Sequence, residues 1–468
     1  MRGEGGLRST GTASGTRLVV LALALVAGAV LIPVGAHQAH GSTTVLVALF
    51  AAVAGLAWLG RSCRPYGLFS LGGITWATVA VLFVGRWFFP PVSQAFLTPI
   101  AVGYYDRNRA LIASAVFVVV FALAYSTSRR DRPGRPRDPD ADTITTGEAK
   151  GPLSTSVSVA DLVVASGLLI GIRLMTALAF QVGVPGRQPA GIPLVGVIYY
   201  ASSYGPLAGA ALILWFARDV RSGARLAGAL LLCDVLVEAV VGSHGTAFLA
   251  ILVFGAARAT VGRPVRITAA RAIPVGLLVS LVIASALLIS FVARESLNGG
   301  ARQKLGDVPS FVATRFGGIE YLAPVIGAVN HTGSSIRYLR TSNWGRYMSG
   351  EVYGLPPDAQ TGFASTAVGW WYGLGNLRGV AIGSAISGFL AGRFDRWCFR
   401  RRRSPSRLSA AAAIGMLLGW ATFLLGGTIG SLGGISIGFT AIAMALVYGH
   451  NVVSQAASHD DSSVTILP

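Results

Sequence analysis

The stretch RALIASAVFVVVFALAYSTSRRDRPGRPRDPD, residues 109–140, decides the fold class of this chain. Its first part, 109–127, is an apolar run of the length that a helix needs to cross the hydrocarbon core of a bilayer. Its second part is rich in Arg, Pro and Asp and is typical of a flexible segment on the cytoplasmic side of a membrane. The stretch therefore predicts a membrane-spanning helix followed by a cytoplasmic linker.

The rest of the chain repeats this pattern. Of its 468 residues 53% are hydrophobic and only 12% are charged, about half the charged share of an ordinary soluble protein. Apolar runs of roughly 17 to 25 residues recur along it. We therefore predict an all-α, polytopic integral membrane protein of about 12 transmembrane helices, at 17–35, 44–60, 68–86, 109–127, 160–180, 194–217, 225–242, 245–258, 271–292, 376–392, 408–426 and 430–449.

Arginines indicate the orientation of these spans, because short cytoplasmic loops are enriched in Lys and Arg. With the N-terminus inside, the short exported loops hold only Arg86, Arg107, Arg109 and Arg187. Both termini are then cytoplasmic. The predicted units are helices 1–4 in 1–127, a flexible linker in 128–158, helices 5–9 in 159–292, one large exported loop in 293–375, helices 10–12 in 376–450, and a cytoplasmic tail in 451–468.

Charge and motifs exclude several classes of function. The formal net charge of +19 suggests a nucleic-acid partner. Most arginines, however, lie in short gaps between apolar runs, so they indicate the orientation of the spans in the membrane. We therefore expect no nucleic-acid partner. Cys63, Cys233 and Cys398 form no CxxC pair, and the chain has no GxxxxGK[ST] or HExxH motif. We expect no metal and no cofactor.

Glycines recur every four residues near the C-terminus, at Gly426, Gly430, Gly434 and Gly438. On a helix this spacing gives a flat face on which a second helix can approach closely. We therefore predict a helix-packing face there.

Ionisable residues inside spans are functional candidates, because burying a charge in a bilayer is unfavourable. Arg173 lies in the fifth predicted span, and Asp234 and Glu238 lie four residues apart on one face of the seventh. Glu238 and Arg173 have similar predicted depth, so they form either a buried ion pair between two helices or a polar patch below an outward cavity. His244 follows at the exported end of the seventh span.

The predicted exported loop carries the remaining candidates. Guanidinium groups bind phosphate oxygens in a bidentate manner, so arginines at the outer face suit a lipid-linked pyrophosphate. A basic surface attracted to anionic lipid is the alternative. Aromatic rings can stack on sugars or form an interfacial belt. The candidates are Arg294, Arg315, Arg337 and Arg340, the acid Glu320, and the aromatic residues Trp370, Trp371 and Tyr372.

Two segments of this region, RFGGIEYLAPVIGAVNH (315–331) and TGFASTAVGWWYGLGNLRG (361–379), add a family resemblance. With the many spans, the small exported loop containing Arg187 and the large exported loop, the chain resembles the bacterial oligosaccharide repeat unit polymerases of the Wzy type, which act in O-antigen and capsule synthesis. The chain differs from these polymerases at His244, because family members often carry an arginine near this position.

The resemblance implies a metal-independent glycosyltransferase of the bacterial cytoplasmic membrane. It would join undecaprenyl-pyrophosphate-linked oligosaccharide repeats at the outer leaflet, among membrane lipids and beside a flippase and a chain-length regulator. We expect pyrophosphate to bind Arg173, Arg294 and Arg315, with Arg337 and Arg340 as second choices. Glu320 or His244 would be the base, with Glu238 as a further candidate.

Two other functions stay open. An O-antigen ligase shares the multispan plan, the large exported loop and the lipid-linked donor. A transporter or flippase of lipid-linked oligosaccharide would use intramembrane charges such as Arg173 and Asp234 for its substrate.

Overall fold

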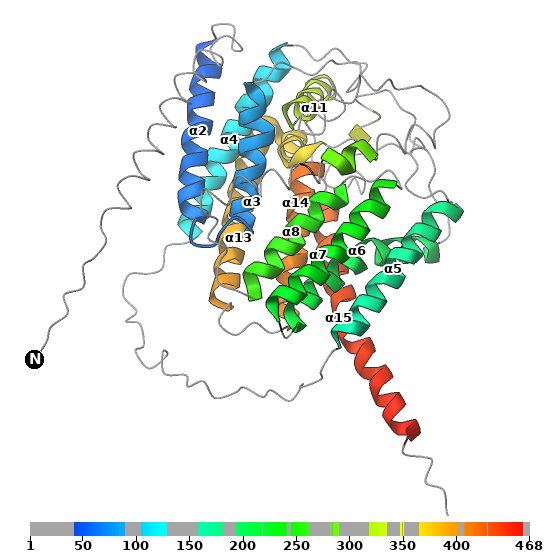
Figure 1. The fold of residues 1–468 in the computed structure, drawn as a ribbon. Helices are drawn as coiled ribbons and strands as arrows, with labels where there is room; N and C mark the ends of the chain where they lie inside the picture. The colour runs from blue at the N-terminus through cyan, green and yellow to red at the C-terminus, as the bar shows by residue number, and fades with distance from the viewer. Residues whose placement is uncertain are drawn as a thin grey trace, which may run out of the picture.

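A computed structural model describes residues 42–88, 104–128, 158–180, 193–217, 219–240, 245–261, 281, 284–289, 318–334, 347–348, 350, 365–401, 407–427 and 429–461. Helices and short connections fill these ranges, and no residue within them forms a strand (Figure 1). The all-α prediction is confirmed.

The helices follow the apolar runs of the sequence. They are α2 (Thr43–Cys63), α3 (Leu71–Thr78), the π-helix η1 (Val79–Gly85), α4 (Tyr104–Ser128), α5 (Val159–Phe180), α6 (Pro193–Phe216), α7 (Val220–Val240), α8 (Gly245–Val261), α11 (Gly318–Thr332), α13 (Thr366–Arg401), α14 (Arg407–Gly426) and α15 (Ile429–Asp461). The last helix continues past the predicted end of its span at 449, because NVVSQAASHDD contains no residue that breaks a helix.

Six helices of the described part are long and apolar enough to cross a membrane. They contain the segments Thr43–Cys63, Asp106–Ser128, Val159–Ala179, Val197–Phe216, Thr366–Arg400 and Leu408–Gly426. Large apolar side chains point outward from them, including Phe50 on α2, Met175 on α5 and Ile382 on α13. Such faces suit a lipid environment, and they indicate a membrane protein.

The predicted number of about 12 spans is not reached in the described residues. Three further apolar helices are shorter, at Leu71–Gly85, Gly245–Ala259 and Leu432–Tyr448. Helix α7 is not among the six, because Arg225, Asp234 and Glu238 interrupt its apolar sequence. The predicted first span, 17–35, lies outside the described residues, and 271–292 is described only at 281 and 284–289.

The helices form two neighbouring groups. In the first, α4 contacts α2, α11 and α13, and α3 contacts α2, α13 and α14. In the second, α6 contacts α5, α7, α8 and α15. Helix α14 joins them through its contacts with α15 and α8. Figure 1 shows α11 at one end of the first group, beside η1 and the start of α4.

Small residues allow α4 and α13 to lie close together. A Cβ on Gly388 would lie 2.4 Å from the backbone oxygen of Phe121, and one on Gly392 would lie 2.0 Å from Ser128 Oγ. Gly434 and Gly438 of the predicted glycine face do not have this role among the described residues, because a Cβ on either would meet nothing within 4 Å there. The close contacts in the described residues are made by other glycines, on α13 against α4 and on α14, where a Cβ on Gly415 would lie 2.6 Å from the backbone oxygen of Ser436 in α15.

Helix α13 contains a break at Gly375 and Asn376, where Asn376 has a φ of 54°. Asparagine is one of the few non-glycine residues that tolerate this left-handed region. The break coincides with the predicted boundary between the loop region 293–375 and the span that begins at 376. The segment from Thr366 to the break is helical, and it includes Trp370, Trp371 and Tyr372, which we call the aromatic trio.

Candidate functional site

Arg86 and Glu320 form a buried ion pair between two elements that are distant in the sequence. Arg86 follows directly after η1, Glu320 lies in the first turn of α11, and Arg86 Nη2 is 2.7 Å from Glu320 Oε1. The side chains are 9% and 6% exposed. A carboxylate in the first turn of a helix is also stabilised by the helix dipole. The pair therefore fixes the start of α11 against the end of η1.

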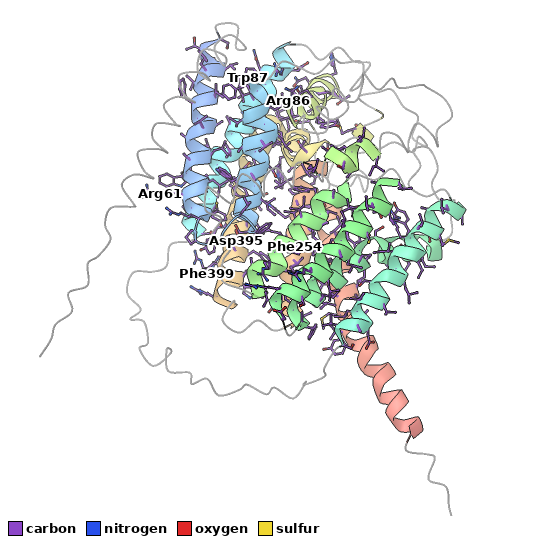
Figure 2. The ribbon with its side chains drawn as sticks, viewed as in Figure 1. Arg61, Arg86, Trp87, Phe254, Asp395 and Phe399 are labelled. Carbon is purple, nitrogen blue, oxygen red and sulfur yellow. The ribbon has the colours of Figure 1, made fainter. Side chains whose placement is uncertain are left out.

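Arg107 supplies a second buried positive charge that acts on this pair. It lies in the first turns of α4, is 5% exposed, and its guanidinium carbon is 5.1 Å from the centre of the Trp87 ring. Its charge acts on the Glu320 carboxyl group. Figure 2 shows Arg86 and Trp87 at the end of the first helix group opposite Arg61 and Asp395. We call Arg86, Arg107 and Glu320 the two-arginine site.

Burial governs the chemistry of the carboxyl group in this site. It raises the pKa of Glu320 above its usual range, although Arg86 and Arg107 act in the opposite direction. A carboxylate whose pKa lies closer to neutral is a better general base than an ordinary glutamate. The guanidinium of Arg86 on this carboxyl group, with the positive charge of Arg107 acting on it, is suited to an anion with several oxygens, such as a phosphate or pyrophosphate.

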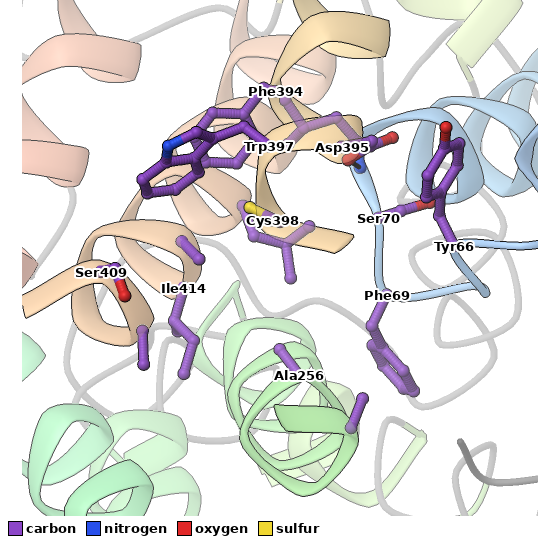
Figure 3. A pocket seen from close by; sticks show the side chains of 15 residues that line it. Tyr66, Phe69, Ser70, Ala256, Phe394, Asp395, Trp397, Cys398, Ser409 and Ile414 are labelled. Atoms are coloured by element: carbon purple, nitrogen blue, oxygen red, sulfur yellow. Dashed lines mark hydrogen bonds between the residues drawn. The ribbon is translucent and has the colours of Figure 1, made fainter. Parts of the chain in front are cut away.

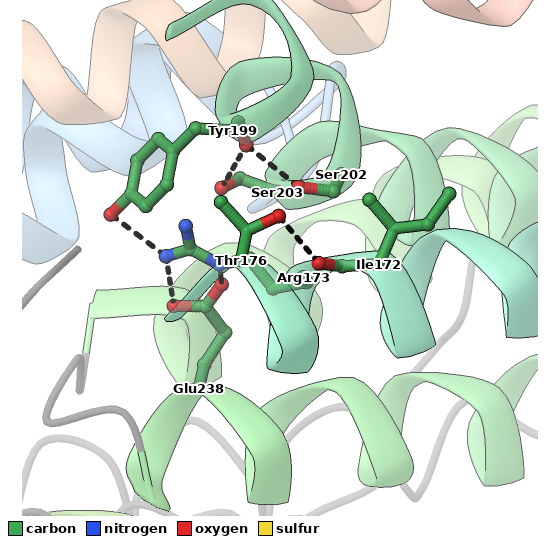
Figure 4. A network of polar contacts seen from close by, with 7 residues as sticks. All are labelled: Ile172, Arg173, Thr176, Tyr199, Ser202, Ser203 and Glu238. Atoms are coloured by element: carbon green, nitrogen blue, oxygen red, sulfur yellow. Dashed lines mark hydrogen bonds and ion pairs between the residues drawn. The ribbon is translucent and has the colours of Figure 1, made fainter. Parts of the chain in front are cut away.

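A second polar cluster lies between α5, α6 and α7 (Figure 4). Arg173 Nη2 donates to Glu238 Oε2 at 3.0 Å and to the Tyr199 hydroxyl at 2.8 Å, and Arg173 Nε donates to Glu238 Oε1. Arg173 is 2% and Glu238 is 1% exposed. Of the two alternatives that the sequence leaves open, the structure forms the ion pair. The pair therefore joins α5 to α7, and Tyr199 joins α6 to both.

The aromatic trio is packed inside the protein. Trp370 is 2% exposed and packs edge-on against Phe423 of α14, with ring centres 6.1 Å apart. Tyr372 is 4% exposed, and its hydroxyl group donates to Asn330 Oδ1 at 3.2 Å. Trp371 lies over Gly383, where a Cβ would come within 2.0 Å of its ring. Burial leaves Trp370 and Tyr372 with almost no ring face for a sugar, and the trio joins α13 to α11 and α14.

Asp395 organises a third cluster at the opposite end of the first helix group. It accepts hydrogen bonds from the backbone N–H groups of Leu71 and Gly72, at 2.8 and 2.9 Å, and from the Tyr125 hydroxyl group at 2.7 Å. It therefore caps α3 from α13 and joins both helices to α4. A cavity of about 60 Å³ adjoins it and is lined mainly by apolar residues, with Ser70, Asp395 and Ser409 as polar members (Figure 3).

The other predicted site residues lie outside the described residues. They are His244, Arg294, Arg315, Arg337 and Arg340. Within the described ranges, no three His, Cys, Asp or Glu side chains come together as a metal site.

The sequence does not single out Arg86 and Arg107 as site residues, although both lie in predicted exported loops. That position is itself a signal, because short exported loops are depleted in arginine. An arginine that occurs there needs a local reason, and a buried carboxylate provides one for Arg86.

No protein-family model matches the chain, and neither a curated protein nor a solved structure shows significant similarity to it.

Proposed function

We propose that the protein is a metal-independent glycosyltransferase that polymerises undecaprenyl-pyrophosphate-linked oligosaccharide repeats into a cell-surface polysaccharide. The observation that supports this best is the two-arginine site, in which the buried guanidinium of Arg86 is paired with the buried carboxyl group of Glu320 and the buried Arg107 acts electrostatically on the same carboxyl group. The reaction needs these groups: cations for the leaving pyrophosphate and a base for the acceptor hydroxyl group.

In this proposal the two-arginine site lies at the outer face of the bacterial cytoplasmic membrane. The chain crosses that membrane many times, with both termini in the cytoplasm. The arginine pattern supports this orientation, because Arg61 and the basic stretch around Asp395 and Phe399 lie at the end of the first helix group opposite Arg86. A flippase would deliver the repeats to this face, and a chain-length regulator would act on the product.

The chemical step follows from the charges. The pyrophosphate group of the donor binds Arg86 and Arg107, and it competes with Glu320 for Arg86. Glu320 then accepts the proton of a sugar hydroxyl group on the incoming repeat as its oxygen attacks the anomeric carbon. The bond between that carbon and the pyrophosphate oxygen breaks, and the arginines stabilise the charge on the leaving group. We assign Arg294 and Arg315 to the same pyrophosphate.

Conservative variants in membrane extracts test the proposal. Lysine keeps the charge of Arg86 but not its planar fork, so we expect Arg86→Lys to slow chain growth by about 10²-fold. Glu320→Gln should lower turnover by about 10²- to 10⁴-fold, as loss of a general base does. Arg61→Lys is the matched control, since Arg61 is exposed at the other end of the first group and should behave as the wild type.

The products separate the competing functions. A polymerase variant leaves single repeats on the carrier at the outer leaflet. If long chains still form on the carrier and only their transfer to a final acceptor fails, the protein is a ligase. If the repeats stay at the inner leaflet, it is a transporter. Normal chain growth in both Arg86→Lys and Glu320→Gln, at normal protein levels, would refute the assigned site.

A further inference from the structure

Asp234 is a buried carboxyl group to which the proposed glycosyl transfer gives no role. It lies on α7, one helical turn before Glu238, and is 0% exposed. Within the described residues, neither of its oxygens has a hydrogen-bond partner. Asp395 is the contrast in the same chain, since three donors surround its carboxylate.

The neighbouring helices supply one positive charge for two carboxyl groups. Helix α5 contributes Arg173, and α6 contributes Tyr199, which bonds to Arg173. Helix α8 carries a charge only at Arg258, in its last turn. In the described part of the chain, Glu238 and Arg173 are the groups that act electrostatically on Asp234. Because Glu238 occupies Arg173, an ionised Asp234 would be a second, uncompensated buried charge.

Arg173 retains one donor that could serve Asp234. Its Nε and Nη2 atoms bond to Glu238, whereas its Nη1 is buried and has no acceptor among the described residues. A buried donor and a buried carboxyl group, both without hydrogen-bond partners among the described residues, therefore lie near enough to act on each other electrostatically. The donor lacks an acceptor, and the carboxyl group lacks a donor.

We infer that Asp234 is a proton-binding site within the membrane region, and that Arg173 is shared between Glu238 and Asp234. In the resting protein the Asp234 carboxyl group holds the proton and is neutral, while Glu238 is ionised on Arg173. When the proton passes to water, the new carboxylate attracts the Nη1 side of Arg173. The exchange is independent of the glycosyl transfer proposed above and gives the α5–α7 contact two charge states.

Infrared spectroscopy of the reconstituted protein tests the first half of this inference. A protonated carboxyl group has a carbonyl band that a carboxylate lacks, and exchange into D2O shifts it. We expect Asp234→Asn to fold normally and to remove one such band at neutral pH. The matched control is Asp219→Asn, which should leave the band unchanged. Hydrogen bonds from Ser222 and from the backbone of Arg221 lower the pKa of Asp219 at the exposed start of α7.

Glu238→Gln tests the sharing of Arg173. With Glu238 neutral, Arg173 should pair with Asp234, so the Asp234 band should disappear at neutral pH without any change at Asp234 itself. Persistence of the band in folded Glu238→Gln protein would refute the sharing.

A pH titration of the wild-type protein complements the variants. Raising the pH should remove the band that Asp234→Asn lacks. If the wild-type and Asp234→Asn spectra at neutral pH show the same carbonyl bands, Asp234 is ionised and the inference fails.

Discussion

Replacing Asp395 by asparagine tests the link that joins α3, α4 and α13. Oδ1 accepts the Leu71 N–H, and Oδ2 accepts both the Gly72 N–H and the Tyr125 hydroxyl group. An asparagine amide has one oxygen. Even with this oxygen placed where Oδ2 lies, the amide NH2 group faces the Leu71 N–H, donor against donor.

The expected loss follows from these three bonds. One buried amide without an acceptor costs about 1–3 kcal/mol, and each remaining bond loses its charge assistance, about 0.5–1 kcal/mol. We therefore expect Asp395→Asn to lower the free energy of unfolding by about 2–5 kcal/mol. Tyr125→Phe removes one bond to a charged group and leaves both amides capped, so its loss should be smaller, about 1.5–3 kcal/mol.

Titration of the purified protein with a denaturing detergent in mixed micelles measures these differences. Tyr448→Phe is the control, because Tyr448 is 49% exposed on α15, and it should stay within about 0.5 kcal/mol of the wild type. In the double variant the losses should not add, since both residues act through one hydrogen bond. An Asp395→Asn protein as stable as the control would show that the carboxylate does not hold the start of α3.

Three further predictions concern packing, pH and topology. Gly388→Leu should destabilise the protein by about 1–3 kcal/mol or more in the same titration, because its Cβ would lie 2.4 Å from the Phe121 oxygen, whereas Gly438→Ala should be tolerated. Burial raises the pKa of Glu320, so the folded protein holds a proton that the unfolded chain releases at lower pH. The contribution of Glu320 to stability should therefore be full below the ordinary carboxyl range and should be lost as the pH rises through the pKa of the folded state. Glu320→Gln should remove this pH dependence, and a variant with the same stability profile against pH as the wild type would contradict the prediction. In a protein without its native cysteines, a membrane-impermeant thiol reagent should label Ser334→Cys but not Arg61→Cys in intact cells, and the reverse pattern would invert the proposed topology.

The apolar runs predicted the helices well, because the length of a spanning helix is fixed by the bilayer. The run 44–60 became Thr43–Cys63, and 408–426 became Arg407–Gly426. The ion pair of Arg173 and Glu238 could also be foreseen, since counting residues from the ends of two spans gives their depths.

The two-arginine site and the Asp395 cluster could not be predicted in the same way. Arg86 and Glu320 belong to elements between which α4, α5, α6, α7 and α8 lie in the sequence, and no spacing rule relates them. Asp395 lies in a basic segment, between Arg393 and Arg396, where its charge resembles that of any other charged residue in the sequence. Its partners at the start of α3 are 324 and 323 residues away and offer only backbone groups, which carry no sequence signal.

The distance between Asp395 and the helix that it caps also orders events during biosynthesis. Helix α3 leaves the ribosome 324 residues before its cap does, which at about 5–20 residues per second is a delay of roughly 15–60 s. During that interval the Leu71 and Gly72 amides cannot have their final acceptor, although α2 and α4 are already made. A nascent chain that stops before Asp395 should therefore leave α3 accessible to membrane proteases. Release of the complete chain should protect α3 from them.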